Sequence, residues 1–217
     1  MPSNQPIGIF DSGFGGLTVA RAIIDLLPSE DIVYYGDTSR YPYGPQPLEE
    51  VKSYSQQISD YLIAEHDVKM IVIACNTASA AAEGDLRNST EIPIVGVITP
   101  GAQAVAEVSS TKKIGVIGTV GTINSQAYDN AIKGISPENI ELVSVACPGF
   151  VEFVERGEFE GEQVRILADR LLAPVIQADV DALLLGCTHY PYLARAIGES
   201  VGEGVVLVSS ADETAFA

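Results

Sequence analysis

Basic residues are scarce in this chain. Its 217 residues include 12 Lys and Arg against 29 Asp and Glu, which gives a formal net charge of −17. Because nucleic-acid phosphates are bound by clustered cations, a nucleic-acid partner is not expected. The same charge balance disfavours docking on an anionic membrane surface. It also raises the question of what would hold an anionic ligand.

Long apolar runs and targeting signals are missing as well. No apolar run approaches the roughly 20 residues that a membrane-spanning helix needs. The first residues lack the basic region of a secretory signal peptide, and the apolar stretch after them is interrupted by Asp11 and by glycines. A cytoplasmic protein without a membrane partner is therefore expected.

Cysteine is rare, and its spacing argues against two common roles. The three cysteines, Cys75, Cys147 and Cys187, are odd in number and far apart, so no disulfide framework is implied. The chain has no Cys-x-x-Cys pair, which argues against a zinc site. The simplest interpretation is that all three are free thiols buried as small hydrophobic residues.

Apolar residues, by contrast, are plentiful. The chain is 47% hydrophobic and 19% charged, so it can bury a sizeable core and is not disordered. Short β-branched runs alternate with amphipathic stretches, which predicts an α/β fold with mostly parallel sheets flanked by helices. The predicted strands are Ile7–Phe10, Ile32–Tyr35, Met70–Ala74, Ile94–Ile98, Lys113–Ile117, Ile140–Val145, Ala182–Leu185 and Val205–Val208.

A weak internal repeat indicates two similar halves. Residues 71–77 resemble residues 183–189: in each segment an apolar strand leads into a cysteine and then into short polar residues. We therefore predict two pseudo-symmetric domains, with the last strand returning to the first. The first domain would comprise residues 1–98 and 207–217, and the second residues 99–206. Chance similarity between two buried strands is the alternative, and the matching cysteines disfavour it.

Polar residues gather where the predicted strands end. The carboxyl ends of parallel strands are the edge at which open α/β sheets bind ligands. These clusters are residues 11–16, 36–38 with 42–44, 75–77, 118–119 with 122, and 187–189.

The glycine loop 13–16 leaves two other interpretations open. Asp37 lies at about the 20-residue spacing of a dinucleotide site, although the charge of Asp11 would not suit a pyrophosphate. The glycines would otherwise serve a tight turn between strand and helix.

Two of the cysteines suggest a chemistry. A thiol at the amino end of a helix is acidified by the free N–H groups there. Cys75 and Cys187, one from each half, would face each other across a cleft between the domains. Such a pair can remove a proton from one face of a carbon and return it to the other, which inverts configuration without a cofactor. A thiol hydrolase using Cys187 and His189 is an alternative, but it leaves Cys75 without a role.

Other polar residues near these edges invite an assignment. His189 lies two residues from Cys187, which favours a functional role. Glu155 is the member of an acidic run expected to point inward and support His189. Arg40 would pair with a substrate carboxylate or with Asp37, and the sequence does not decide between them. Cys147 has no counterpart in the repeat, so we expect it to be structural.

Five long motifs carry a family resemblance. They are Ile9–Leu17, Tyr35–Thr38 with Pro42–Gly44, Ala74–Ser79, Ile114–Thr119 and Gly186–Pro191. Through them the chain, from about Ile7 to Val208, resembles the cofactor-independent glutamate racemases of the aspartate/glutamate racemase superfamily.

The resemblance implies a site between two domains, with Cys75 and Cys187 as the acid/base pair that interconverts L- and D-glutamate. Cys75 would deprotonate D-glutamate, and Cys187 would deprotonate L-glutamate. Asp11 and His189 would assist the two thiols, with Glu155 as a helper, and no cofactor or metal is expected. The implied substrate-binding residues are Asp11, Ser12, Pro42, Tyr43, Gly44, Asn76, Thr77, Thr119, Thr188 and His189.

The resemblance also implies a setting: D-glutamate supply for peptidoglycan in a bacterial cytoplasm, and a homodimer. Some positions depart from the family pattern. Gly149 and Glu152 stand where a bulkier residue and Pro are usual, and Ser209 stands where Asp is common. Family members usually continue for several tens of residues beyond the position of Ala217, with a helix that packs on the first domain. Racemisation of aspartate or another small amino acid is the nearest alternative, and a nucleotide-binding module is a more distant one.

Overall fold

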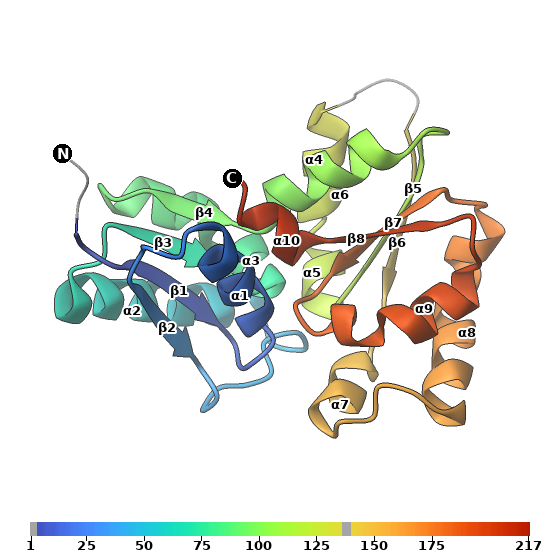
Figure 1. Cartoon of the computed structure of the whole chain (residues 1–217), viewed down its shortest axis with the longest axis horizontal. Helices are drawn as coiled ribbons and strands as arrows, with labels where there is room; N and C mark the ends of the chain where they lie inside the picture. Colours follow the sequence, from blue (N-terminus) through green and yellow to red (C-terminus); the bar gives the residue numbers. More distant parts are fainter. Residues whose placement is uncertain (1–3, 136–139) are drawn as a thin grey trace.

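A computed structural model describes residues 4–135 and 140–217 and shows two α/β domains side by side (Figure 1). Strands and helices alternate along the chain as the sequence predicts. In chain order, the elements of the described residues are β1 (Ile7–Asp11), α1 (Leu17–Leu26), β2 (Ile32–Gly36), α2 (Leu48–His66), β3 (Met70–Ile73), α3 (Asn76–Ser89), β4 (Ile94–Gly96), α4 (Ile98–Val108), β5 (Lys113–Gly118), α5 (Val120–Asn124), α6 (Ala127–Ile135), β6 (Glu141–Ala146), α7 (Phe150–Glu155), α8 (Glu162–Gln177), β7 (Ala182–Gly186), the 3₁₀ helix η1 (Tyr190–Leu193), α9 (Ala194–Val201), β8 (Val206–Ser209) and α10 (Ser210–Thr214).

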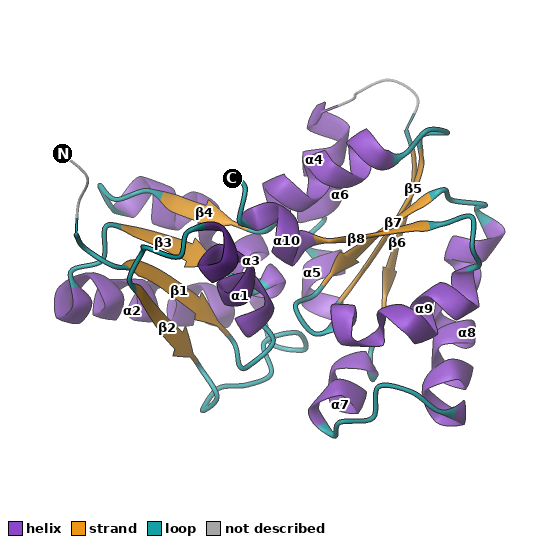
Figure 2. Cartoon of the chain, in the orientation of Figure 1, coloured by secondary structure: helices purple, strands orange, loops and turns teal. Residues whose placement is uncertain are grey.

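Each domain contains one four-stranded parallel sheet flanked by helices (Figure 2). The strand orders are β2-β1-β3-β4 and β6-β5-β7-β8, so the two sheets share one topology. The predicted fold class and the predicted repeat are therefore confirmed. In this repeat β3 corresponds to β7, which places Cys75 and Cys187 after equivalent strands.

The last strand does not return to the first domain, so that prediction is wrong. β8 pairs in parallel with β7, from Ala182 opposite Val206 to Leu185 opposite Ser209. The apolar run of β8 finds its hydrogen-bond partners at the open edge of β7, as β4 does at the edge of β3. Helix α10, which follows, lies against α1 and α4, and Ala211 packs in the core beside β1. The bounds of the two domains stay a prediction.

Both faces of each sheet carry an apolar core, as expected for strands that are solid apolar runs. In β1, Ile7 and Ile9 pack toward α1, whereas Phe10 packs with residues of α2 and α3. The second sheet lies between α4 and α6 on one face and α7, α8 and α9 on the other. Among the helices that the structure describes, none combines the length and apolar character needed to cross a bilayer.

Candidate active site

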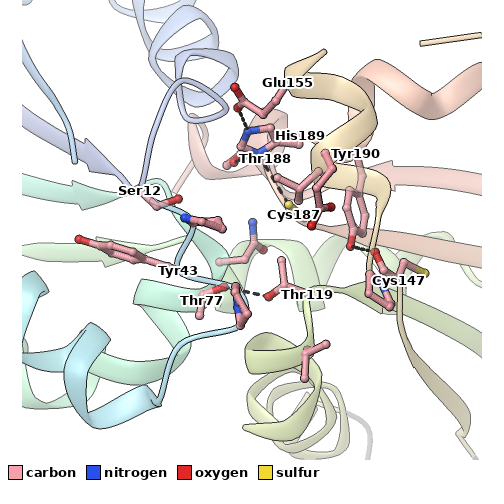
Figure 3. Close-up of a pocket in the computed structure, with 18 of the residues that line it drawn as sticks. Ser12, Tyr43, Thr77, Thr119, Cys147, Glu155, Cys187, Thr188, His189 and Tyr190 are labelled. Atoms are coloured by element: carbon pink, nitrogen blue, oxygen red, sulfur yellow. Dashed lines mark hydrogen bonds and ion pairs between the residues drawn. The ribbon is translucent and has the colours of Figure 1, made fainter. Parts of the chain in front are cut away.

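Loops at the carboxyl ends of strands in both sheets converge on one cavity of about 550 Å³ (Figure 3). The cavity brings together the predicted site residues from the two domains, with one exception. Asp11 is completely buried and does not line it. The predicted residues that line the cavity are Ser12, Pro42, Tyr43, Gly44, Cys75, Asn76, Thr77, Thr119, Glu155, Cys187, Thr188 and His189.

Cys75 lies between the end of β3 and the first residue of α3. Burial raises the pKa of its thiol to about 12, and the nearby charge of Asp11 acts in the same direction. Hydrogen bonds from the Ala78 N–H and from Ser12 lower it. The prediction that the start of the helix lowers the thiol pKa is therefore wrong. Loss of water raises the pKa by more than these hydrogen bonds lower it.

Cys187 occupies the equivalent position after β7. Burial raises the pKa of its thiol, the N–H groups of His189 and Tyr190 oppose that shift, and a charge on Cys75 adds to it. The two thiols are thus close enough for a charge on Cys75 to raise the pKa of Cys187. Because two like charges in one dry site repel each other, a state with a single thiolate is favoured over a state with two.

His189 connects Cys187 to an acidic side chain. Its Nε2 lies 2.7 Å from Oε1 of Glu155, and its Nδ1 lies 3.9 Å from the sulfur of Cys187. When Nε2 carries the hydrogen and donates it to Glu155, Nδ1 is left as an acceptor facing the thiol. The expected contact between Glu155 and His189 is therefore present (Figure 3).

Asp11 lies behind the cavity wall and links the two domains. One carboxylate oxygen accepts the Gly13 N–H at 2.9 Å, and the other accepts the Thr188 hydroxyl at 3.4 Å. Burial raises the pKa of Asp11, and the charge of His189 lowers it. Gly15 allows the glycine loop to lie close to Thr188, since a Cβ at this position would lie 2.4 Å from the Thr188 hydroxyl oxygen.

A ring of three hydroxyls joins the domains at the other side of the cavity. Thr77 of α3 lies 2.9 Å from Thr119 and 3.1 Å from Thr122, and those two lie 3.0 Å apart. Thr119 also caps α5 by accepting the Thr122 N–H. Beside the ring, the Gly121 N–H donates to the Gly44 carbonyl at 2.8 Å.

The structure settles the open question about Arg40. Its Nε lies 2.6 Å from the buried Asp37, which also accepts the Tyr43 hydroxyl at 2.5 Å. Arg40 does not line the cavity, and Arg156 is the one Lys or Arg among the described residues that do. The Arg156 side chain pairs with Glu158. A ligand carboxylate in this cavity would therefore meet mostly N–H groups and hydroxyls.

Sequence reasoning did not assign several residues to the cavity wall. They are Tyr41, Pro45, Val120, Cys147, Pro148, Gly149, Val151, Glu152, Arg156 and Tyr190. Those at 147–149 follow β6, so the strand-end rule that found the other clusters would have found them too. The sulfur of Cys147 points away from that of Cys187 (Figure 3). Within the described parts of the chain, no group of three His, Cys, Asp or Glu residues is arranged to hold a metal ion.

Known proteins similar to this chain are racemases. A sequence model of the family described as Asp/Glu/Hydantoin racemase matches residues 8–216. A glutamate racemase of a Parafrankia strain is 53% identical over 98% of this chain and 76% of its own. The crystal structure of glutamate racemase RacE1 from Bacillus anthracis has a TM-score of 0.94 and 44% identity, and covers 98% of this chain and 79% of that one. The glutamate racemase of Francisella tularensis in complex with D-glutamate has a TM-score of 0.91 and 38% identity, with 98% and 79% covered.

Proposed function

The chain belongs to the Asp/Glu/Hydantoin racemase family, and on that premise we propose that it interconverts L- and D-glutamate with two thiols as acid and base. One observation carries the proposal. Cys75 and Cys187 follow equivalent strands of two like domains and line one cavity. That placement suits proton transfer at opposite faces of one carbon.

In the proposed binding mode, neutral donors hold the substrate carboxylates. Such donors are the N–H groups at the start of α3 and the lining hydroxyls of Ser12, Thr77, Thr119 and Thr188. The side-chain amide nitrogen of Asn76 is buried and has no hydrogen-bond partner among the described residues, so it offers a further donor. Glutamate is preferred as substrate because the relatives compared above are glutamate racemases, one of them bound to D-glutamate.

The proposed reaction moves one proton at a time. With L-glutamate, His189 takes the Cys187 proton at Nδ1. The imidazolium that forms is stabilised by its ion pair with Glu155. The Cys187 thiolate removes the Cα proton, and the Cys75 thiol then protonates the opposite face, with Asp11 adjusting the acidity of Cys75. After product release, His189 gives up its proton to solvent and Cys75 takes one from solvent, which restores the two thiols. D-glutamate reacts through the same steps in reverse, with Cys75 as the base and Cys187 as the acid. Because the Cα proton is very weakly acidic, the donors must already be in place in a dry site.

We extend the proposal to the cellular setting. The relatives are bacterial, so the chain would act in a bacterial cytoplasm, where D-glutamate supplies peptidoglycan synthesis. The family resemblance further suggests a homodimer that needs no cofactor.

The test follows hydrogen exchange and optical rotation together. The protein is incubated with L-glutamate in D₂O, and loss of rotation and Cα deuterium are measured, with L-aspartate as the competing substrate. We expect both signals from the parent with glutamate, and no loss of rotation from Cys75→Ala or Cys187→Ala, since each variant lacks the thiol that serves one face of Cα. Cys147→Ala is the matched control, a third buried thiol whose loss leaves most of the activity. Full racemisation by either of the first two variants would exclude the two-thiol mechanism, and faster turnover of aspartate would reassign the substrate.

A further inference from the structure

Asn76 has a side-chain amide that is satisfied at one end only. The residue begins α3, is 3% exposed and lines the cavity. Its carbonyl oxygen accepts the Tyr128 hydroxyl at 2.5 Å and lies 3.4 Å from the Ser210 hydroxyl. Its amide nitrogen has no partner among the described residues. Since a buried donor without a partner is destabilising, a donor left in this state is suited to a ligand.

Tyr128 reaches this amide from the other domain. It lies in α6, 52 residues further along the chain, and its side chain is buried between α4 and the end of β7. One glycine makes room for its ring, because a Cβ on Gly186 would lie 2.9 Å from the ring. Its hydroxyl lies at ordinary contact distance, 3.4 Å, from the Cβ position of Gly101 in α4. The packing therefore fixes the ring so that its hydroxyl meets Asn76.

The direction of the hydrogen bonds sets the orientation of the amide. Burial raises the pKa of Tyr128, so its hydroxyl keeps a hydrogen to donate to the Asn76 carbonyl, and the Ser210 hydroxyl donates to the same carbonyl. Both hydroxyls thus point hydrogen toward the Asn76 carbonyl. A turned amide would place that carbonyl in the cavity, where it would repel a carboxylate instead of binding one.

We propose that Tyr128, supported by Ser210, is a positioning residue that turns the Asn76 amide so that its NH₂ group binds a substrate carboxylate. This inference rests on the proposed function only in taking the ligand to be a carboxylate. Its structural basis is a contact between domains. The second domain therefore determines which end of a first-domain side chain faces the substrate.

The first experiment measures steady-state racemisation of D- and L-glutamate by Tyr128→Phe. Loss of the hydroxyl frees the amide to turn, so KM rises about tenfold, the equivalent of one hydrogen bond of about 1.4 kcal/mol, while kcat changes much less. Tyr35→Phe in β2 is the matched control, because Tyr35 lies outside the cavity wall, and its KM stays at the parent value. In a double-mutant cycle, Tyr128→Phe adds nothing to the KM of Asn76→Ala, because its effect requires the amide.

A second experiment does not depend on turnover. The side-chain NH₂ signals of Asn76 are followed by ¹H–¹⁵N NMR in the ligand-free protein, where Tyr128→Phe shifts them and Tyr35→Phe does not. Unchanged signals, an unchanged KM in Tyr128→Phe, or additive effects in the cycle would each overturn the positioning role. A parent protein that leaves glutamate unchanged would refute the proposed function instead, and the NMR result would still decide the orientation of the amide.

Discussion

At the scale of single residues, burial controls the acidity of the thiols more than local hydrogen bonds do. Cys75 and Cys187 both have pKa values raised by burial, even though N–H groups point at each of them. In the ligand-free protein both are thus neutral at physiological pH. A thiolate forms when a nearby group takes the proton, which is the part that His189 can play for Cys187.

A pH dependence of stability follows from these shifts. The Cys75 pKa rises from 9.0 to about 12 on folding, so this thiol contributes stability that is complete below pH 9 and is lost as the pH rises toward 12. Across that interval the unfolded chain has released a proton that the folded protein retains. The unfolding free energy should therefore fall by about 1.4 kcal/mol per pH unit from this group.

Urea denaturation of the parent and of Cys75→Ala at several pH values from 8 to 11, under reducing conditions, tests this expectation. The variant lacks the group, so its stability should fall less steeply above pH 9. Parallel slopes for the two proteins would contradict the expected shift.

Single residues also show where sequence reasoning stopped. The strand-end rule and the repeat were enough to predict Cys75, Asn76 and Cys187, since each lies next to a recognisable strand. Tyr128 gives no such signal. It occupies an apolar position of an amphipathic helix, and its partner Asn76 lies in the other domain. Only the packing of two domains brings those polar atoms together.

At the scale of elements, the junction between the domains depends on close backbone approach. Helix α5 contacts the loop after β2 through the Gly121 N–H and the Gly44 carbonyl. The hydroxyl ring beside them joins α5 and its cap residue Thr119 to Thr77 of α3. The sequence located β8 within one residue but assigned it to the wrong sheet. An apolar run predicts a strand, but it does not say which open edge that strand will join.

Replacing each of two glycines with alanine should distinguish tight packing at the domain junction from an ordinary effect of helix propensity. A Cβ on Gly121 would lie 2.9 Å from the Gly44 carbonyl oxygen and 3.0 Å from the Thr77 methyl group, so Gly121→Ala should lose about 1–3 kcal/mol of stability and raise KM. Gly84 in α3 has open space around it, so Gly84→Ala should gain up to about 1 kcal/mol. Thermal unfolding and steady-state kinetics measure both effects. Equal responses of the two variants would argue against a tightly packed junction.

At the scale of the whole molecule, the charge of −17 opposes an anionic substrate. The cavity wall offers one Arg among its described residues, and that side chain pairs with Glu158. Specific neutral donors would then bind glutamate against a repulsive long-range field. Such a field weakens with salt, because the screening length shortens from about 30 Å at 0.01 M to about 8 Å at 0.15 M.

Raising NaCl from 10 to 150 mM should therefore lower KM for glutamate by about twofold. KCl should give the same curve, since the effect depends on ionic strength and not on the ion. A KM that rises with salt would instead indicate a direct cation contact, and Arg156→Gln would then abolish that rise.

The two thiols have unlike neighbours, a carboxylate near Cys75 and an imidazole paired with a carboxylate at Cys187. The proposed reaction nevertheless joins mirror images of equal free energy, so its equilibrium constant is one. At equilibrium the forward and reverse fluxes must match, which makes kcat/KM identical for the two enantiomers. If the unlike neighbours make kcat larger for one enantiomer, the KM for that enantiomer must therefore be larger by the same factor.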